Sequence, residues 1–307
     1  MSKNTQLPTT TPQPLDSSAI FIVGANGQLG TALRKKYPDA RYADISELDI
    51  TNQSSVENFD WNGIEVILNA AAYTNVDGAE SSEGRVAAWK VNADAVANLV
   101  AVAAQKNMTL VHISTDYVFD GTQEIHTEQE PFSPLSVYGA SKAAGDLLVS
   151  MLPKHYILRT SWVIGEGNNF VRTMLNLGQK GIEPTVVADQ IGRLTFTSTL
   201  VDAIDHLLTS NFHLPPSNPA PYGTYNVSNA GNPASWADIT RKIYELAGFN
   251  LEVTDTTTEK YYKGKEGIAP RPLQSILDLS RIENTGFAPR DWQEDLQAYV
   301  QKELNND

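Results

Sequence analysis

The chain has 307 residues, of which 41% are hydrophobic, a formal net charge of -13 and no cysteine. This length allows one large domain or two domains around a sizeable core. The composition excludes disulfide bonds, thiolate nucleophiles and zinc-thiolate sites, and the acidic charge with scattered basic residues argues against nucleic acid or a membrane as partner.

The first 16 residues contain several prolines and threonines and almost no apolar residue. This composition predicts a disordered tail or an inter-domain linker over residues 1–16, with the fold beginning near Ser17. The segment lacks the basic and apolar stretches of a signal peptide, and we find no run of about eighteen apolar residues. These features predict a cytoplasmic protein.

Short apolar runs alternate with helical stretches from Ser17 onwards. Strands are expected at 19–23, 40–43, 66–69, 109–114 and 156–160, and helices at 29–37, 84–105 and 136–152. This alternation predicts an α/β fold with a doubly wound parallel sheet of the Rossmann type. Ligands bind such sheets at the carboxyl edge, where Gly24, Asn69, Ser114 and Thr160 end their strands.

The pattern loosens after residue 165, where loops rich in Gly, Asn and Pro separate the elements. A helix at 197–208, a strand at 223–227 and a helix at 235–247 are expected there. We therefore expect a dinucleotide-binding domain over 17–165 and elements near 195–230 that return to it. A smaller C-terminal α/β lobe, mainly for substrate binding, is expected over 166–307.

A glycine-rich turn, Gly24-Ala-Asn-Gly-Gln-Leu-Gly30, joins the first strand to the first helix. Glycines at such a turn let the backbone approach a pyrophosphate, although this spacing differs from the commonest fingerprint and the turn could be purely structural. Asp44 follows twenty positions after Gly24, at the end of the second strand. Its carboxylate can accept hydrogen bonds from the hydroxyls of an adenosine ribose.

The same carboxylate would repel a ribose 2′-phosphate, which favours NADH. Arg34, Lys35 or Arg41 could lie close enough to accommodate that phosphate, so the cofactor is predicted as NADPH or NADH. Alternatively, the Asp44 carboxylate is simply solvated at a strand end, and Asp49 caps the segment that follows.

Tyr138 and Lys142 lie four residues apart on a predicted helix and therefore share one of its faces. The Lys142 ammonium can then lie beneath the phenol and lower its pKa from a usual value of about 10. Thr115, at the end of strand 109–114, can donate a hydrogen bond to a substrate carbonyl as charge develops there. A lone threonine is more often structural, but these three residues together predict a nicotinamide-dependent carbonyl reductase.

Three further side chains have two interpretations each. Asn92 either holds a water that links Lys142 to solvent or satisfies a neighbouring carbonyl. Trp162 either covers a sugar ring or packs in the core. His112 is more typical of a satisfied core or edge residue than of a catalytic group. The five histidines show no paired spacing for a metal, so no metal site is predicted.

On these residues the chain resembles the extended short-chain dehydrogenase/reductases and, within them, the dTDP-4-dehydrorhamnose reductases. The matching segments are 24–30, 69–77, 114–121, 138–142, 159–162 and 269–273. The resemblance covers nearly everything from residue 17 to the end. It implies reduction of the 4-keto group of dTDP-6-deoxy-L-lyxo-4-hexulose to dTDP-L-rhamnose, with hydride from NADPH or NADH.

The resemblance also implies roles for the motif residues. Thr115, Tyr138 and Lys142 would be catalytic, with Asn92 as a further candidate. The sugar would contact Thr115, Asp116, Tyr117, Tyr138 and Trp162. Cofactor contacts would come from Tyr138 and Lys142 and from Gly24, Asn26, Gly27, Gln28, Leu29, Gly30, Asp44, Asp49, Ile50, Ala71, Ala72 and Tyr73.

Segment 189–195 lacks the proline that many relatives have before the threonine. This segment and the N-terminal tail look most like the reductase half of fused proteins, so a fused or associated 3,5-epimerase is a candidate partner. The dimer-interface carboxylates that bind magnesium in some relatives find no match here, and either a monomer or a homodimer is expected.

Two rival functions stay open. One is a non-catalytic nucleotide-binding regulatory subunit, similar to the β subunit of methionine adenosyltransferase. The other is an NAD-dependent epimerase or dehydratase acting on another sugar nucleotide. The intact set of Thr115, Tyr138 and Lys142 favours an enzyme over the first, and tightly held NAD that is regenerated in each cycle would identify the second.

Overall fold

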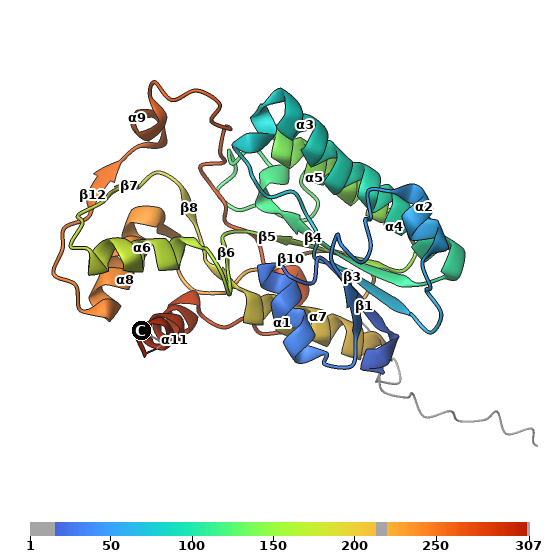
Figure 1. The fold of residues 1–307 in the computed structure, drawn as a ribbon. Helices are drawn as coiled ribbons and strands as arrows, with labels where there is room; N and C mark the ends of the chain where they lie inside the picture. The colour runs from blue at the N-terminus through green and yellow to red at the C-terminus, as the bar shows by residue number, and fades with distance from the viewer. Residues whose placement is uncertain (1–15, 213–219, 306–307) are drawn as a thin grey trace, which may run out of the picture.

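The computed structural model describes residues 16–212 and 220–305, so the tail predicted over 1–16 lies, apart from Asp16, outside the described residues. A sheet lobe and a smaller lobe stand side by side (Figure 1). Six parallel strands form the main sheet, in the order β10-β5-β4-β3-β1-β2. The predicted doubly wound α/β fold is confirmed.

The strands of the sheet are short and their register brings the predicted polar ends together. They are β1 (Ile20–Val23), β2 (Arg41–Ala43), β3 (Val66–Asn69), β4 (Thr109–Thr115), β5 (His155–Thr160) and β10 (Gly223–Asn226). Asn69 pairs with His112, and Thr115 pairs with Thr160. The chain passes from β1 outward to β2 and then back to β3, so a ligand crevice is expected between the ends of β1 and β3.

Helices cover both faces of this sheet (Figure 1). One face packs against α1 (Gln28–Lys36) and α7 (Thr197–Phe212), and the other against α2 (Gln53–Asn58), α4 (Ala95–Lys106) and α5 (Val137–Val149). Successive side chains of a strand point to opposite faces. Ile20 and Ile22 accordingly join the first core, whereas Phe21 and Val23 join the second.

The helix predicted over 84–105 is interrupted. It runs as α3 (Ser82–Trp89), a π-helical turn at Lys90–Asp94, and α4. By length and composition alone the stretch Ser82–Lys106 could cross a membrane. An 18-residue part of it has a mean hydropathy of 1.2, and 44% of that part is buried in the protein. The apolar side chains of its α4 part belong to the core beneath the sheet, whereas Val86 and Trp89 of α3 are exposed.

The smaller lobe has its own core, centred on Ile243, Trp292 and Leu296. Its elements are β6 (Val163–Ile164), α6 (Phe170–Gln179), β7 (Thr185–Val187), β8 (Ile191–Gly192), β9 (Thr195–Phe196), β11 (Ala234–Ser235), α8 (Trp236–Ala247), β12 (Thr254–Thr256), α9 (Thr258–Tyr262) and α11 (Trp292–Asn305). Helix α10 (Ser280–Glu283) lies between α9 and α11 in the chain, but its Ile282 packs in the first core of the sheet. The segment before α10 is tied to the loop after β3, since Asp77 accepts from Ala269 N at 3.0 Å and from Arg271 at 2.8 Å.

Candidate active site

Two adjoining cavities lie at the carboxyl edge of the sheet. The first has a volume of about 380 Å³ and the second about 590 Å³. Both are lined by Gly27 and by Ala70, Ala71 and Ala72, which follow β3. Cavities of this size and position are typical of cofactor and substrate sites. The two spaces together could hold a dinucleotide with a second ligand beside it.

The glycine turn shapes the wall of the first cavity. Gly24 has a φ of +74°, and a Cβ there would lie 2.6 Å from Ala71 N. A Cβ on Gly30 would lie 2.1 Å from Gly24 O, so this glycine permits α1 to pack against the turn. Helix α1 begins after Gly27 without a side-chain cap. Its first N–H groups therefore remain available to a phosphate, which fits the predicted pyrophosphate site.

Asp44 lines the first cavity and also braces the turn. Its carboxylate accepts from Asn26 N at 3.0 Å and from Ile45 N at 2.8 Å. Arg34 lies over the Tyr42 ring at 4.0 Å and donates to Asn26 Oδ1 at 3.3 Å. Asn26 therefore contacts both the Asp44 carboxylate, which would repel a ribose 2′-phosphate, and the Arg34 guanidinium, which would attract one.

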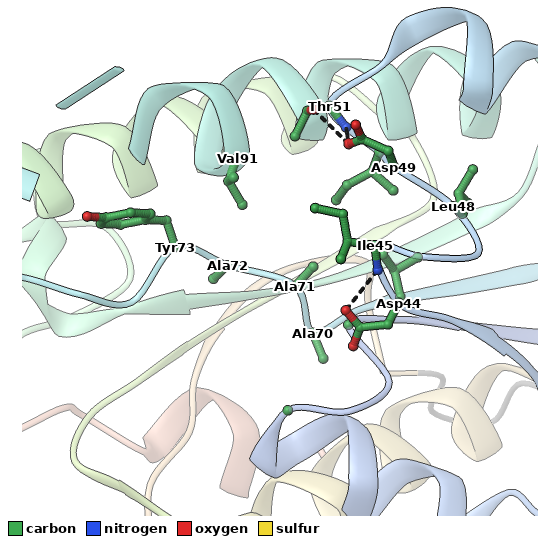
Figure 2. A pocket seen from close by; sticks show the side chains of 14 residues that line it. Asp44, Ile45, Leu48, Asp49, Thr51, Ala70, Ala71, Ala72, Tyr73 and Val91 are labelled. Carbon is green, nitrogen blue, oxygen red and sulfur yellow. Dashed lines mark hydrogen bonds between the residues drawn. The ribbon is translucent and has the colours of Figure 1, made fainter. Parts of the chain in front are cut away.

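Further predicted cofactor residues line the same cavity. Figure 2 shows Asp44 at the end of β2 and the segment from Ala70 to Tyr73 after β3 around this space. Asp49 and Ile50 complete its wall. Asp49 accepts from the N and Oγ1 of Thr51, at 2.9 and 2.7 Å, and these hydrogen bonds lower the pKa of its carboxyl. Asp49 therefore both caps a turn and lines the cavity.

The second cavity collects the predicted catalytic and sugar-binding residues. Thr115, Asp116, Tyr117, Tyr138, Lys142 and Trp162 all line it, as do Gln28 and Leu29. The Tyr117 and Tyr138 rings meet edge to face with centroids 5.5 Å apart. Residues from β4, α5 and the end of β5 therefore converge on one space, as the shared carboxyl edge of parallel strands requires.

The electrostatics of Tyr138 differ from the prediction. Desolvation raises the pKa of its phenol above the usual value, and the charge of Asp116 raises it further, whereas hydrogen bonding to Thr115 lowers it. Lys142 is not the dominant neighbour that the i,i+4 spacing predicted. The phenol is therefore held in its protonated form at neutral pH, which suits a proton donor.

Lys142 is directed at β4 instead of at the phenol. Its Nζ donates to the carbonyl of Ile113 at 2.6 Å and lies 3.2 Å from His112 Nε2. Burial lowers the pKa of Lys142 to about 8, although the charge of Asp146 acts in the opposite direction. The helical spacing placed Lys142 in the right cavity, but a side chain with several rotatable bonds is not fixed by spacing alone.

Thr115 is held by its neighbours in the sequence. Its hydroxyl donates to Asp116 Oδ1 at 2.9 Å and accepts from Tyr117 N at 3.2 Å. Burial raises the pKa of the Asp116 carboxyl to about 6, against hydrogen bonds from Ser275 and Thr115 that lower it. The hydroxyl proton of Thr115 must turn away from Asp116 before it can reach a substrate oxygen.

Asn92 lies in the π-helical turn, with its side chain fully engaged. Its Oδ1 accepts from Tyr73 N at 2.9 Å, and its Nδ2 donates to Tyr73 O at 3.1 Å and to Ser141 Oγ at 3.0 Å. These contacts correspond to the second interpretation, in which Asn92 satisfies neighbouring polar groups. Through them it anchors the loop after β3 to α5, and a catalytic role for it stays a prediction.

Several polar atoms of the second cavity are buried without a hydrogen-bond partner among the described residues. They include Gln28 Oε1, Thr160 Oγ1 and Ser161 Oγ. A buried polar atom without a partner costs about 1–3 kcal/mol. Ser161 was not predicted, although its position directly after a strand end at the ligand edge was a usable signal.

Trp162 has an unusual backbone and a fixed ring. Its φ of 50° is in the left-handed region, which costs a residue with a side chain of this size about 1–3 kcal/mol. The indole stacks on Trp236 of α8, with centroids 3.8 Å apart and planes 21° apart. The ring packs against the core of the smaller lobe, as the second interpretation expects, and it also lines the cavity, while its contact with a sugar stays a prediction.

Within residues 16–212 and 220–305, no group of three or more His, Cys, Asp or Glu side chains is arranged to hold a metal ion. The histidine that lies closest to the proposed chemistry is His112, which is fully buried and contacts Lys142.

A family model and a curated relative match this chain over most of its length. The model of the RmlD substrate binding domain matches residues 18–305. A dTDP-4-dehydrorhamnose reductase of Aggregatibacter actinomycetemcomitans is 39% identical over 308 residues, covering 92% of this chain and 99% of that protein.

Two solved structures are similar over nearly the whole chain. The crystal structure of a dTDP-4-dehydrorhamnose reductase from Clostridium acetobutylicum ATCC 824 has a TM-score of 0.84 at 38% identity, covering 93% of this chain and 99% of that one. The structure of a dTDP-4-dehydrorhamnose reductase from Bacillus anthracis str. Ames in complex with NADP has a TM-score of 0.82 at 36% identity, covering 92% and 98%.

Proposed function

The chain belongs to the family defined by the RmlD substrate binding domain, and we propose on that premise that it is a dTDP-4-dehydrorhamnose reductase. It reduces the 4-keto group of dTDP-6-deoxy-L-lyxo-4-hexulose to give dTDP-L-rhamnose, with NADPH or NADH as the reductant. The reaction is the last step of dTDP-rhamnose synthesis.

One observation carries the proposal for the reacting centre. Thr115, Tyr138 and Lys142 line a single cavity that adjoins the cavity at the glycine turn. The reaction needs a proton donor beside a carbonyl oxygen and a nicotinamide beside the carbonyl carbon. The two adjoining cavities provide space for both.

Tyr138 is proposed as the acid of the reaction. A bound dihydronicotinamide supplies the hydride that adds to the keto carbon. The carbonyl oxygen becomes negatively charged as the hydride adds and accepts the proton of the Tyr138 hydroxyl. The ketone is thereby reduced to an alcohol, and Tyr138 is left as a phenolate. Because the pKa of the Tyr138 phenol is raised, the acid form is present over the whole neutral range.

Lys142 and Thr115 are proposed to support this proton transfer. The buried Lys142 lines the same cavity, and its ammonium form returns a proton to Tyr138 through hydroxyl groups and water, which leaves the amine. Thr115 donates to the carbonyl oxygen once its hydrogen turns away from Asp116. The sugar contacts of Asp116, Tyr117 and Trp162 are proposed from the same cavity wall.

The choice of cofactor is proposed to depend on Asp44. We expect Asp44→Asn to raise the preference for NADPH over NADH about tenfold, since removing one negative charge near a 2′-phosphate is worth about 1.4 kcal/mol at partial exposure. The single side-chain oxygen of Asn can still accept from Asn26 N, which keeps the contact to the turn, while the bond from Ile45 N is lost. The ratio of kcat/KM for the two cofactors measures the effect, and an unchanged ratio contradicts it.

The function is tested directly by mixing the protein with the 4-keto sugar nucleotide, a 3,5-epimerase and NADPH or NADH. Loss of absorbance at 340 nm with formation of dTDP-L-rhamnose is the expected result. Purified protein that carries tightly bound NAD and does not consume the reduced cofactor would instead identify an epimerase or dehydratase. Cofactor binding without any turnover would support the regulatory subunit.

Several broader assignments also belong to this proposal. The division into a nucleotide-binding part over 17–165 and a mainly substrate-binding lobe over 166–307 is supported by two separate cores. A cytoplasmic location is proposed from the similarity to dTDP-4-dehydrorhamnose reductases, and cell fractionation tests it. A 3,5-epimerase, fused or associated, is the proposed source of substrate, and co-purification with a tagged chain tests for it.

A further inference from the structure

A buried chain of polar groups runs from the nucleotide cavity to Lys142. Ala71 N donates to Asn69 Oδ1 at 3.2 Å, and Asn69 Nδ2 lies 3.0 Å from His112 Nδ1. His112 Nε2 lies 3.2 Å from Lys142 Nζ, which in turn donates to Ile113 O at 2.6 Å. Three neighbouring elements, β3, β4 and α5, thus contribute to one continuous connection.

The direction of each hydrogen bond follows from the groups at the two ends. The Ala71 N–H can only donate, so it faces the oxygen of the Asn69 amide. The amide nitrogen of Asn69 is then the donor to His112, and His112 Nδ1 must accept. Because His112 is fully buried and desolvation holds its pKa well below the usual range, the ring is neutral. Its single proton therefore lies on Nε2.

That proton points at Lys142 Nζ, which can accept it only as an uncharged amine. An ammonium at the same place would need His112 Nε2 as an acceptor, so the ring proton would move to Nδ1 and the Asn69 amide would have to turn over. The Ala71 N–H would then lose its partner. The observed arrangement consequently favours the uncharged amine of Lys142.

We propose that His112 is the positioning residue of Lys142, which holds this amine against β4 and sets the pH above which it loses its charge in the reductase reaction. The inference rests on the proposed reductase function only for its kinetic readout. The imidazole does not touch the reacting atoms and acts through the Nε2 contact alone.

The charged groups around Lys142 are few. Asp146 lies one turn further along α5 and favours the ammonium, but it is itself paired with Arg159 of β5 at 3.0 Å. Tyr138 on α5 is held protonated. Asp116 lines the same cavity, and its pKa of about 6 lies below that of Lys142. The transition of Lys142 near pH 8 is expected to appear as a fall in kcat/KM as the pH rises through that value.

The kinetic test compares two substitutions at one position. In His112→Gln, an amide oxygen can accept from Lys142 and favour the ammonium, so the fall in kcat/KM should move up by about one pH unit or more. His112→Asn retains a partner for Asn69 but cannot reach Lys142, so its shift should be smaller. His155 begins β5, whereas Thr160 at the other end of that strand lines the cavity, so His155→Gln should leave the pH profile of kcat/KM unchanged. Variants that lose activity equally at every pH would show a structural role and overturn the proposal.

A spectroscopic test is independent of turnover. With five histidines in the chain, imidazole 15N and 1H spectra of the labelled protein can be assigned by the loss of one signal in His112→Gln. Above pH 8 a neutral ring with its proton on Nε2 is expected, and in the wild type this proton should move to Nδ1 as the pH falls through 8, whereas Lys142→Met should show no such change. A ring that carries its proton on Nδ1 above pH 8, or that becomes charged near pH 6.5, would overturn the proposal even if the reductase assay succeeds.

Discussion

Tyr138→Phe is expected to lower kcat about a hundredfold or more while the affinity for NADPH stays within a factor of about two. The substitution removes one hydroxyl and keeps the ring that packs edge to face against Tyr117. With the proton donor gone, the developing alkoxide must take a proton from water. Steady-state kinetics and a fluorescence titration of NADPH measure the two quantities.

Tyr117→Phe is the matched control for this experiment. It removes a hydroxyl from the neighbouring ring of the same cavity, whose phenol pKa is likewise raised by burial. Its effect should appear mainly in the KM for the sugar nucleotide, with kcat changed about threefold at most. If Tyr138→Phe turns over at a near-normal rate, or if both variants lose kcat equally, Tyr138 is not the acid.

Gly30→Ala is expected to have the second large effect, on folding and on nucleotide binding together. The new Cβ would lie 2.1 Å from Gly24 O and 2.8 Å from Ala25 Cα, both backbone atoms that cannot turn aside. Helix α1 must move away from the turn. We expect a loss of about 3 kcal/mol in the free energy of unfolding. Denaturant unfolding measures it, and the affinity for NADPH should fall in parallel.

Gly27→Ala provides the control because it adds the same methyl group to the same turn. Gly27 has a φ of -70°, which alanine adopts freely, and its Cβ would lie 3.4 Å from Gly24 O. The free energy of unfolding should change by less than about 1 kcal/mol. Equal destabilisation by the two substitutions would show that the close packing of Gly30 is not what the turn requires.

Much of the fold follows from local signals in the sequence. The apolar runs that end at Val23, Asn69 and Thr160 form β1, β3 and β5 of the main sheet, because parallel strands buried on both faces require continuous apolar segments. The glycine turn and the Tyr138 to Lys142 spacing located both cavities. Strand ends determine which residues share an edge, and this information is contained in the sequence order.

The remaining features depend on contacts between distant segments. The direction of Lys142 is set by Ile113 O and His112 on β4, and the state of the Tyr138 phenol is set by burial and Asp116. Helical spacing contains neither piece of information. The role of Ser161 and the stacking of Trp162 on Trp236 likewise depend on where the smaller lobe packs.

The stacked pair of Trp162 and Trp236 also has an optical consequence. Two indoles whose centroids are 3.8 Å apart couple their electronic transitions and produce a paired band in circular dichroism near 225 nm. Since one of these rings lines the substrate cavity, a sugar that shifts it would change this band without any added label. The protein therefore contains an intrinsic chromophore for following ligand entry in a stopped-flow instrument.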